Sequence, residues 1–313
     1  MLGFLFIDKP QGMSSFDVVR KLRKICGMRG VCSANTVVGR RTALRSARRM
    51  GFVGTLDPLA TGLMIVALGE ATKMLHFLEG LDKKYEVMIH LGATSDTYDA
   101  VGKITPYDQP KKPFKDAIQQ VLTTQFVGEQ QQQPPIFSAI HVNGERAYDL
   151  ARKGEKVELK KRTVHFYDVK LVSYKWPLLQ LSVHCSSGTY IRSLAHDLGQ
   201  ILKCGGYVET LRRTEISNFS LQKAVLLKDL TPENVPGFLL PLEEIFPEWH
   251  HINLESEQYE ILAQGGFIVY GKPNSLIDQP LLAFYQGQCV GILEWVDSSR
   301  PHRLKFLKKF ILS

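Results

Sequence analysis

The stretch GFVGTLDPLATG at positions 51–62 holds one carboxylate, Asp57, in a turn with no other titratable side chain. The glycines that flank it, Gly51, Gly54 and Gly62, allow a ligand to come close to the backbone. A carboxylate in such a place can do catalytic work as a nucleophile or a base. The alternative is structural, because an aspartate before a proline is a common helix start, with Asp57 as N-cap. The turn taken alone favours the cap.

Two other side chains could serve chemistry at a distance in the sequence. Arg192 lies in the first turn of the helix expected from TYIRSLAHDLGQILK, for which Thr189 is a plausible cap. A cation there opposes the helix dipole by a few tenths to about 1 kcal/mol, which suggests a partner acid. Tyr85 begins the alternating segment YEVMIHLG on its apolar side. Taken alone, a surface arginine and a core tyrosine are the simpler interpretations.

The elements that would carry these residues mix strands and helices without a regular βαβ repeat, which favours an α+β fold. Lys9 and Pro10 belong to a turn, and Leu211 would ordinarily be a core residue of its strand. The polar run QQQQPP at 130–135 suggests a loop. We expect strands near 5–8, 62–69, 85–92, 164–174, 178–185 and 207–216, and helices near 14–25, 70–81, 114–126, 147–153 and 189–203. A small β-rich domain is expected over 247–313.

Composition limits the class of protein. The chain has 313 residues, with 44% hydrophobic and 22% charged, which is ordinary globular composition for one large domain with a small one, or two comparable ones. The apolar start MLGFLFI is too short and too soon interrupted by charge to be a signal peptide, and no run approaches a membrane span. Five irregularly spaced cysteines suggest neither zinc nor a disulfide framework. We expect a cytoplasmic protein.

The charge is unevenly distributed. The formal net charge is +8, and the segment 18–56 holds ten Lys/Arg and no acid. A run of one sign this long favours a contact surface for phosphate, or a disordered insert. Residues 27–49 show no clean period and read as a basic insert.

Six blocks of sequence, in order, carry a family resemblance. They are FIDKPQGMSSFDVV, GTLDPLATGLMIVALGEATK, KKYEVMIHLGATSDTYDAVG, QQQPPIFSAIHVNGERAYDLARKG, CSSGTYIRSLAHDLG and YVETLRRTEIS. Together they resemble the tRNA pseudouridine-55 synthases of the TruB family, up to about residue 245. The tail resembles, loosely, that family's small PUA-like RNA-binding domain. The resemblance implies domains over 1–246 and 247–313, and a pseudouridine synthase fold with a mixed, mainly antiparallel sheet and flanking helices.

The resemblance also implies roles for residues that the patterns alone left open. Asp57 matches the catalytic aspartate, Arg192 the arginine that pairs with it, and Tyr85 the aromatic that stacks on the flipped uracil. Leu211 matches an apolar residue of the pocket. Lys9 and Pro10 match an N-terminal motif that supports the site. No redox change or group transfer is implied, so we expect no cofactor and no metal. The implied partner is the T-arm of tRNA, bound by a monomer, with no membrane.

Two departures from the family pattern stand out. Phe52–Val53 replaces the usual His-Thr, whose histidine helps open the T-loop. Phe52 can still wedge and stack, but it cannot hydrogen-bond or titrate, so we expect activity to persist with altered RNA folding. The basic insert 27–49 is longer than the usual connection and is either a phosphate contact or a lineage-specific loop. A segment at about 128–162 is expected to grip RNA.

Three hypotheses remain on these grounds. The leading one is a cofactor-free tRNA pseudouridine synthase acting on the T-loop uridine at position 55. The second is an RNA-binding, tRNA-folding factor with weak or dispensable catalysis, which Phe52 supports and the set Asp57, Tyr85 and Arg192 opposes. The third is a basic scaffold protein with no RNA partner, whose binding would be insensitive to salt.

Overall fold

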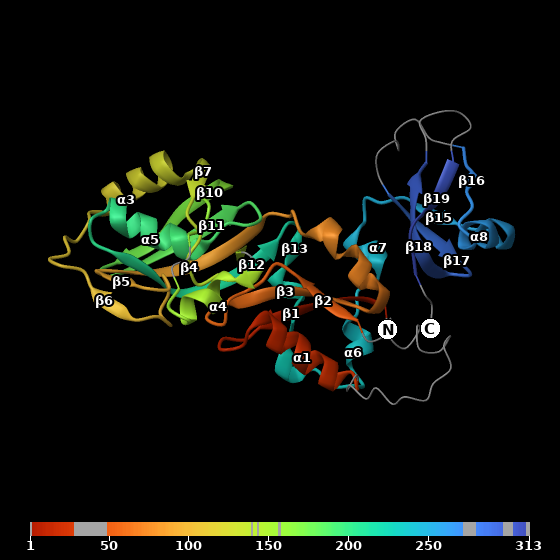
Figure 1. The fold of residues 1–313 in the computed structure, drawn as a ribbon, viewed down its shortest axis with the longest axis horizontal. Coiled ribbons are helices and arrows are strands. Elements are labelled where there is room, and N and C mark those ends of the chain that lie inside the picture. The colour runs from red at the N-terminus through yellow and green to blue at the C-terminus, as the bar shows by residue number, and fades with distance from the viewer. Residues whose placement is uncertain are drawn as a thin grey trace.

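A computed structural model describes residues 2–27, 49–138, 140–142, 144–155, 158–271, 280–296 and 303–310. Most of the predicted basic insert, 28–48, lies outside the described residues. Two β-sheets dominate the fold, and separate parts of the chain form them (Figure 1). The exact domain boundary at residue 246 stays a prediction.

The larger sheet has ten strands, eight of which follow the order β14-β1-β3-β12-β4-β11-β10-β7, with β2 beside β3 and β13 beside β12. Only β1 with β14 and β3 with β12 pair in parallel among the described strands of this sheet. This confirms the predicted mixed, mainly antiparallel sheet. The strands are β1 (Gly3–Lys9), β2 (Met50–Val53), β3 (Thr61–Leu68), β4 (Lys83–Leu91), β7 (Gly128–Gln132), β10 (Arg162–Lys175), β11 (Leu178–Cys185), β12 (Gly206–Ile216), β13 (Phe219–Ser220) and β14 (Val225–Leu226).

Helices and short hairpins surround this sheet. Ser14 caps α1, and its side chain and that of Asp17 form a reciprocal capping box. The apolar stripe of α5, including Leu194 and Leu198, packs on Val87 and Val208 in the core. The elements are α1 (Ser15–Ile25), η1 (Gly69–Leu78), α3 (Lys115–Val121), η2 (Leu122–Phe126), α4 (Ala147–Arg152), α5 (Ile191–Ile201), η3 (Leu221–Lys223), η4 (Leu227–Asp229), α6 (Val235–Phe238), α7 (Leu242–Ile245), and the hairpin strands β5 (Ala93–Ser95), β6 (Ile104–Pro106), β8 (His141–Val142) and β9 (Glu145–Arg146).

Local structure departs from the sequence predictions in four places. No helix follows Asp57, so the N-cap interpretation is wrong, and the N–H of Ala60 instead closes a turn onto the carbonyl of Asp57 at 3.1 Å. The expected loop at 130–135 is half strand, because β7 pairs its backbone with β10 whatever the polarity of its side chains. The segment 69–78 is a 3₁₀ helix. Tyr190, without a side-chain cap bond, rather than Thr189, precedes α5.

The second sheet has five strands in the order β15-β17-β18-β19-β16. Its domain lies at the end of the large sheet remote from α3 (Figure 1). Leu282 and Phe310 of this domain share one apolar cluster with Phe4 and Phe246 of the main body, so the junction is packed. The elements are β15 (His251–Asn253), α8 (Ser256–Ala263), β16 (Ile268–Val269), β17 (Leu281–Tyr285), β18 (Gln288–Trp295) and β19 (Arg303–Lys309). The predicted small β-rich domain is confirmed.

Gly62, at the start of β3, is required by close backbone packing. Its φ is +104°, and a Cβ there would lie 2.2 Å from the carbonyl oxygen of Arg213 in the neighbouring strand. We predict that Gly62→Ala lowers the free energy of unfolding by roughly a few kcal/mol, because the added Cβ would clash with the backbone of Arg213 and because alanine rarely adopts this φ. Thermal unfolding checks this. Gly80→Ala, where a Cβ meets open space, is the matched control and should leave the melting temperature nearly unchanged.

Candidate active site

One pocket of about 480 Å³ opens beside the turn that carries Asp57. The turn forms one side, the first turn of α5 and the residues before it form another, and β4 and β12 form the floor. Among the described residues that line it, Asp57 is the single carboxylate, whereas Lys83, Arg162, Arg192 and Arg213 are cationic. The pocket therefore suits an anionic ligand, one part of which would lie next to the Asp57 carboxylate. The other lining residues are Gly54, Thr55, Leu56, Ala60, Tyr85, Ser138, Ile140, His141, Ser187, Gly188, Thr189, Tyr190, Ile191 and Leu211.

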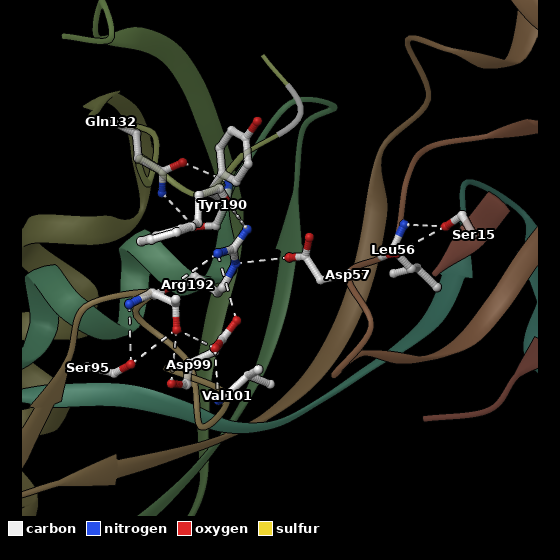
Figure 2. A network of polar contacts seen from close by, with 11 residues as sticks. Ser15, Leu56, Asp57, Ser95, Asp99, Val101, Gln132, Tyr190 and Arg192 are labelled. Carbon is white, nitrogen blue, oxygen red and sulfur yellow. Dashed lines mark hydrogen bonds and ion pairs between the residues drawn. The ribbon is translucent and has the colours of Figure 1, made fainter. Parts of the chain in front are cut away.

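The turn itself is fixed by the start of α1. The Ser15 hydroxyl accepts from the Leu56 N–H at 2.8 Å and donates to the Leu56 carbonyl oxygen at 3.1 Å. The Gly12 N–H donates to the Pro58 carbonyl oxygen at 2.8 Å. Figure 2 shows Ser15 beside Leu56, next in the chain to Asp57. These bonds hold the backbone of the turn on both sides of Asp57. The position of Asp57 therefore does not depend on the contacts of its own side chain.

Arg192 faces Asp57 across the pocket. Its Nε lies 2.9 Å from Asp57 Oδ2, and the predicted pairing of these two residues is present in the structure. Its Nη1 donates to the Thr97 carbonyl oxygen at 3.0 Å, and its Nη2 donates to the Phe137 carbonyl oxygen at 2.9 Å. The side chain of Arg192 is 5% exposed and that of Asp57 is 39% exposed. The arginine is thus immobilised by protein contacts, while the carboxylate stays open to a substrate.

A second acid lies on the other side of the guanidinium. Asp99 Oδ2 is 3.8 Å from Arg192 Nη1, and Asp99 is 5% exposed (Figure 2). Asp99 Oδ1 accepts from the Val101 N–H at 3.0 Å and from the Thr97 hydroxyl at 2.6 Å, so the acid is itself fixed in its loop. Arg192 therefore sits between two carboxylates, of which only Asp57 lines the pocket.

Tyr85 and Leu211 come from neighbouring antiparallel strands, β4 and β12, and both line the pocket. Arg213 lies opposite Tyr85 in the sheet, is 1% exposed, and donates to the carbonyl oxygens of Leu63 at 2.7 Å and Gly54 at 3.0 Å. Burial raises the pKa of the Tyr85 hydroxyl, against the influence of the adjacent Arg213 charge. Tyr85 therefore stays a neutral ring, as a surface for stacking requires.

Lys9 and Pro10 lie outside the residues that line the pocket. Lys9 is fully buried, and its Nζ donates to the carbonyl oxygens of Pro10 at 3.0 Å and Met13 at 2.5 Å. Burial lowers the pKa of Lys9 to about 8, with the Asp57 charge opposing that shift. Lys9 thus ties the loop that leads to Ser15, which fits the predicted supporting role; that role stays a prediction.

Phe52 is placed away from the pocket lining. It lies in β2 opposite Val66, partly buried on an apolar cluster beneath α1. Its ring meets the ring of Phe16 edge to face, with centroids 5.3 Å apart, and Phe16 is 55% exposed. An aromatic pair therefore stands where the family pattern has a histidine. Contact between Phe52 and RNA stays a prediction.

Several residues of the site were not singled out from the sequence. Arg213 follows Leu211 by two positions in one strand, so strand alternation could have found it. Asp99 and Gln132 lie in a loop and an edge strand with no periodic signal. Gln132 is 5% exposed, accepts from the Tyr190 N–H at 2.8 Å, and donates to the Tyr190 carbonyl oxygen at 2.9 Å (Figure 2). Those bonds fix the backbone two residues before Arg192.

A metal site is not indicated by the arrangement of ligands. The described part of the chain holds no group of three or more His, Cys, Asp or Glu side chains placed to bind a metal ion. The cysteines there are unpaired, and three of them, Cys185, Cys204 and Cys289, are buried with the pKa of each thiol raised by burial.

Two family models match this chain. Residues 41–191 match the N-terminal domain of the TruB family of pseudouridylate synthases, and residues 192–246 match the C-terminal domain of tRNA pseudouridylate synthase B. The chain belongs to the TruB family. The matched ranges include Asp57, Tyr85, Arg192 and Leu211, the four predicted site residues that line the pocket.

Curated relatives match most of the chain. The tRNA pseudouridine synthase B of Syntrophomonas wolfei is 38% identical over 94% of this chain and 93% of its own. The enzyme of that name from Actinobacillus pleuropneumoniae is 34% identical over 96% and 95%, and that from Chlamydia abortus is 39% identical over 71% and 86%. The predicted family is confirmed.

Solved structures agree on the TruB fold. A chain of a Cbf5–Nop10–Gar1 complex superposes with a TM-score of 0.66 at 21% identity, covering 99% of this chain and 85% of that one. A chain of an H/ACA ribonucleoprotein bound to a substrate RNA gives 0.65 at 20% identity, covering 99% and 85%. The predicted pseudouridine synthase fold is confirmed. Within the described residues, no helix has the length and apolar character that a membrane span needs.

Proposed function

We propose that this protein is a tRNA pseudouridine synthase that isomerises the T-loop uridine at position 55. The observation that carries the proposal is the Asp57–Arg192 pair, at 2.9 Å, in a pocket that is also lined by three further cations and by the ring of Tyr85. Membership of a family of pseudouridylate synthases and relatives named tRNA pseudouridine synthase B support the reaction and the substrate class. The choice of the T-loop uridine rests on the resemblance of the six sequence blocks.

The reaction is an isomerisation and needs no external reagent. The C1′–N1 bond of uridine breaks, the uracil turns, a C1′–C5 bond forms, and the proton lost from C5 is balanced by one gained at N1. Asp57 would act through its carboxylate, by attack on the sugar or by removing a sugar proton. Arg192 holds that carboxylate from one side, which leaves Oδ1 free to meet the sugar. Atoms and charge balance without a cofactor or a metal.

The target base must leave the RNA stack before it can reach the pocket. Extrusion of a base costs a few kcal/mol, and stacking on an aromatic side chain returns roughly 1–3 kcal/mol per base. Tyr85 of β4 is 7% exposed, and Leu211 lies in the neighbouring strand β12. Because both side chains line the pocket, together they offer an apolar surface to the flipped uracil. The backbone phosphates around that nucleotide would meet Arg162, which is exposed at the pocket.

A tRNA-folding factor with dispensable catalysis is the alternative that Phe52 supports. A direct experiment separates the two. Wild-type protein is incubated with a T-arm RNA at concentrations that saturate binding, and pseudouridine is measured at the target position. Formation of stoichiometric product supports the enzyme; binding with no product at any enzyme concentration would leave only the folding factor.

Electrostatics make a further prediction about the RNA partner. The formal net charge of +8 and the cationic lining of the pocket favour phosphate contacts. The logarithm of the tRNA association constant should fall linearly with the logarithm of salt concentration, with a slope of roughly −0.7 to −0.9 per phosphate contacted. Filter binding at a series of KCl concentrations measures the slope. A slope near zero would support the basic scaffold protein.

Several finer assignments also remain proposals. The segment 128–162 is proposed to grip the RNA, because several of its residues line the pocket, among them Ser138, His141 of β8, and Arg162, the first residue of β10. The small domain is proposed to hold the acceptor-stem side of the tRNA, as a PUA-like module would. We also propose that the protein acts as a monomer in the cytoplasm.

A further inference from the structure

Three consecutive loop residues, Thr97 to Asp99, contact two successive turns of α5. Arg192 and His196 are four residues apart and therefore lie on the same face of the helix. Thr97 and Asp99 contact Arg192, as described above. Tyr98, between them, lays its ring on His196, with ring centroids 3.9 Å apart and planes 14° from parallel. The stack thus sits one turn along the helix from the arginine that holds Asp57.

The backbone at Tyr98 is in an unfavourable conformation. Its φ is 63°, in the left-handed region, which costs a residue with a Cβ about 1–2 kcal/mol. The same backbone is strapped to β12, because the Val208 N–H donates to the Tyr98 carbonyl oxygen at 3.0 Å and the Ala100 N–H donates to the Val208 carbonyl oxygen at 2.9 Å. This conformation turns Thr97 and Asp99 toward the guanidinium. A contact that favours it therefore favours the arrangement around Arg192.

His196 has the properties of a stacking partner. It is half-buried, and within the described residues its buried Nδ1 has no hydrogen-bond partner. Burial lowers the pKa of His196, so the ring is neutral near pH 7. A neutral imidazole over a phenol ring packs flat without a charge to desolvate, and such aromatic pairs contribute about 0.5–1.5 kcal/mol beyond their buried area. That contribution is comparable with the backbone cost at Tyr98.

We propose that Tyr98 and His196 are positioning residues of the active site, which act by holding Thr97 and Asp99 against Arg192. The inference rests on the proposed function, since the readout is pseudouridine formation. Neither ring lines the pocket, so neither is expected to touch the substrate. Their effect should therefore reach the reaction only through the loop and the guanidinium.

The test uses Tyr98→Asn, because asparagine tolerates the left-handed backbone but removes the ring. We expect the single-turnover rate constant to fall about 10- to 100-fold, in line with sub-ångström misplacement of a catalytic group, with the Kd for tRNA within about 2-fold of wild type. Tyr98→Phe keeps the ring and should restore the wild-type rate. The matched control is Tyr167→Asn, which removes a tyrosine ring that is 49% exposed in β10 and lies tilted against the rings of His165 and His184; it should leave the rate unchanged.

A double-mutant cycle shows whether the effect passes through Asp99. In an Asp99→Asn background, Tyr98→Asn should lower the rate by a clearly smaller factor than it does in the wild-type background, because one of the two contacts that it positions is already weakened. Full multiplication of the two effects would overturn the inference, as would a Tyr98→Asn rate equal to that of active wild type.

A crystal structure of Tyr98→Asn supplies a readout that is independent of activity. The inference predicts displacement of Asp99 and of the Thr97 carbonyl from Arg192. Unchanged contacts there would overturn it whether or not the wild-type protein forms pseudouridine, whereas an inactive wild type would count against the proposed function alone.

Discussion

Asp57→Asn should abolish pseudouridine formation. The single-turnover rate constant on tRNA should fall on the order of 10⁴-fold or more, as expected when the group that reacts with the substrate is removed. The amide keeps the shape of the carboxylate but can neither attack the sugar nor take a proton. Its amide oxygen can still face the Arg192 guanidinium in place of the carboxylate oxygen, so the local geometry should survive.

Binding is the control for that variant. The turn is held by the Ser15 and Leu56 bonds and by the Gly12 bond to Pro58, none of which uses the Asp57 side chain. We therefore expect the Kd for tRNA to stay within a few-fold of wild type and the melting temperature to change little. Turnover retained by Asp57→Asn would remove Asp57 from the catalytic role.

Arg192→Lys should lower the rate constant for the isomerisation by at least about 100-fold, although the charge is kept. The guanidinium uses Nε for Asp57, Nη1 for Thr97 and Nη2 for Phe137, a fork that a single ammonium cannot reproduce. The side chain is 5% exposed, so water cannot readily replace the lost contacts. Single-turnover kinetics at saturating enzyme measure the effect on the chemical step.

Arg162→Lys is the matched control, and it separates the effect of the geometry of Arg192 from the effect of its positive charge. Arg162 also lines the pocket but is exposed, and within the described part of the chain no hydrogen bond or ion pair holds its guanidinium in the way that three contacts hold that of Arg192. Arg162→Lys should leave the rate within a few-fold of wild type. Equal and small effects of the two substitutions would mean that Arg192 supplies only positive charge, and the positioning role described for it would be wrong.

Strands with strong alternation were predictable from the sequence. The segment 178–185 is a strand with those same bounds, and Tyr85, Val87, Ile89 and Leu91 all point to the buried side of β4, as alternation requires. The helix at 14–25 was signalled by its serine cap. These elements succeed because local pattern and tertiary packing agree.

The failures have tertiary causes. The glutamines of β7 show no apolar alternation, yet the backbone of β10 offers them partners, and Gln132 is buried because it binds the Tyr190 backbone. Asp57 looked like a helix cap because the sequence around it cannot show that Ser15 binds the backbone of Leu56, 41 residues away from it, and so helps to fix a turn there. The pairing of Asp57 with Arg192 came from family resemblance, since residues 135 positions apart leave no local signal.

Conversion of uridine 55 of tRNA to pseudouridine by this chain can be measured by nucleotide-resolution mapping of pseudouridine in tRNA. The comparison is between cells that contain the protein, cells that lack it, and cells that carry only Asp57→Asn. We expect pseudouridine at position 55 with the wild-type protein, and uridine there in the other two. Undiminished pseudouridine at that position in cells lacking the protein, or with Asp57→Asn alone, would contradict it.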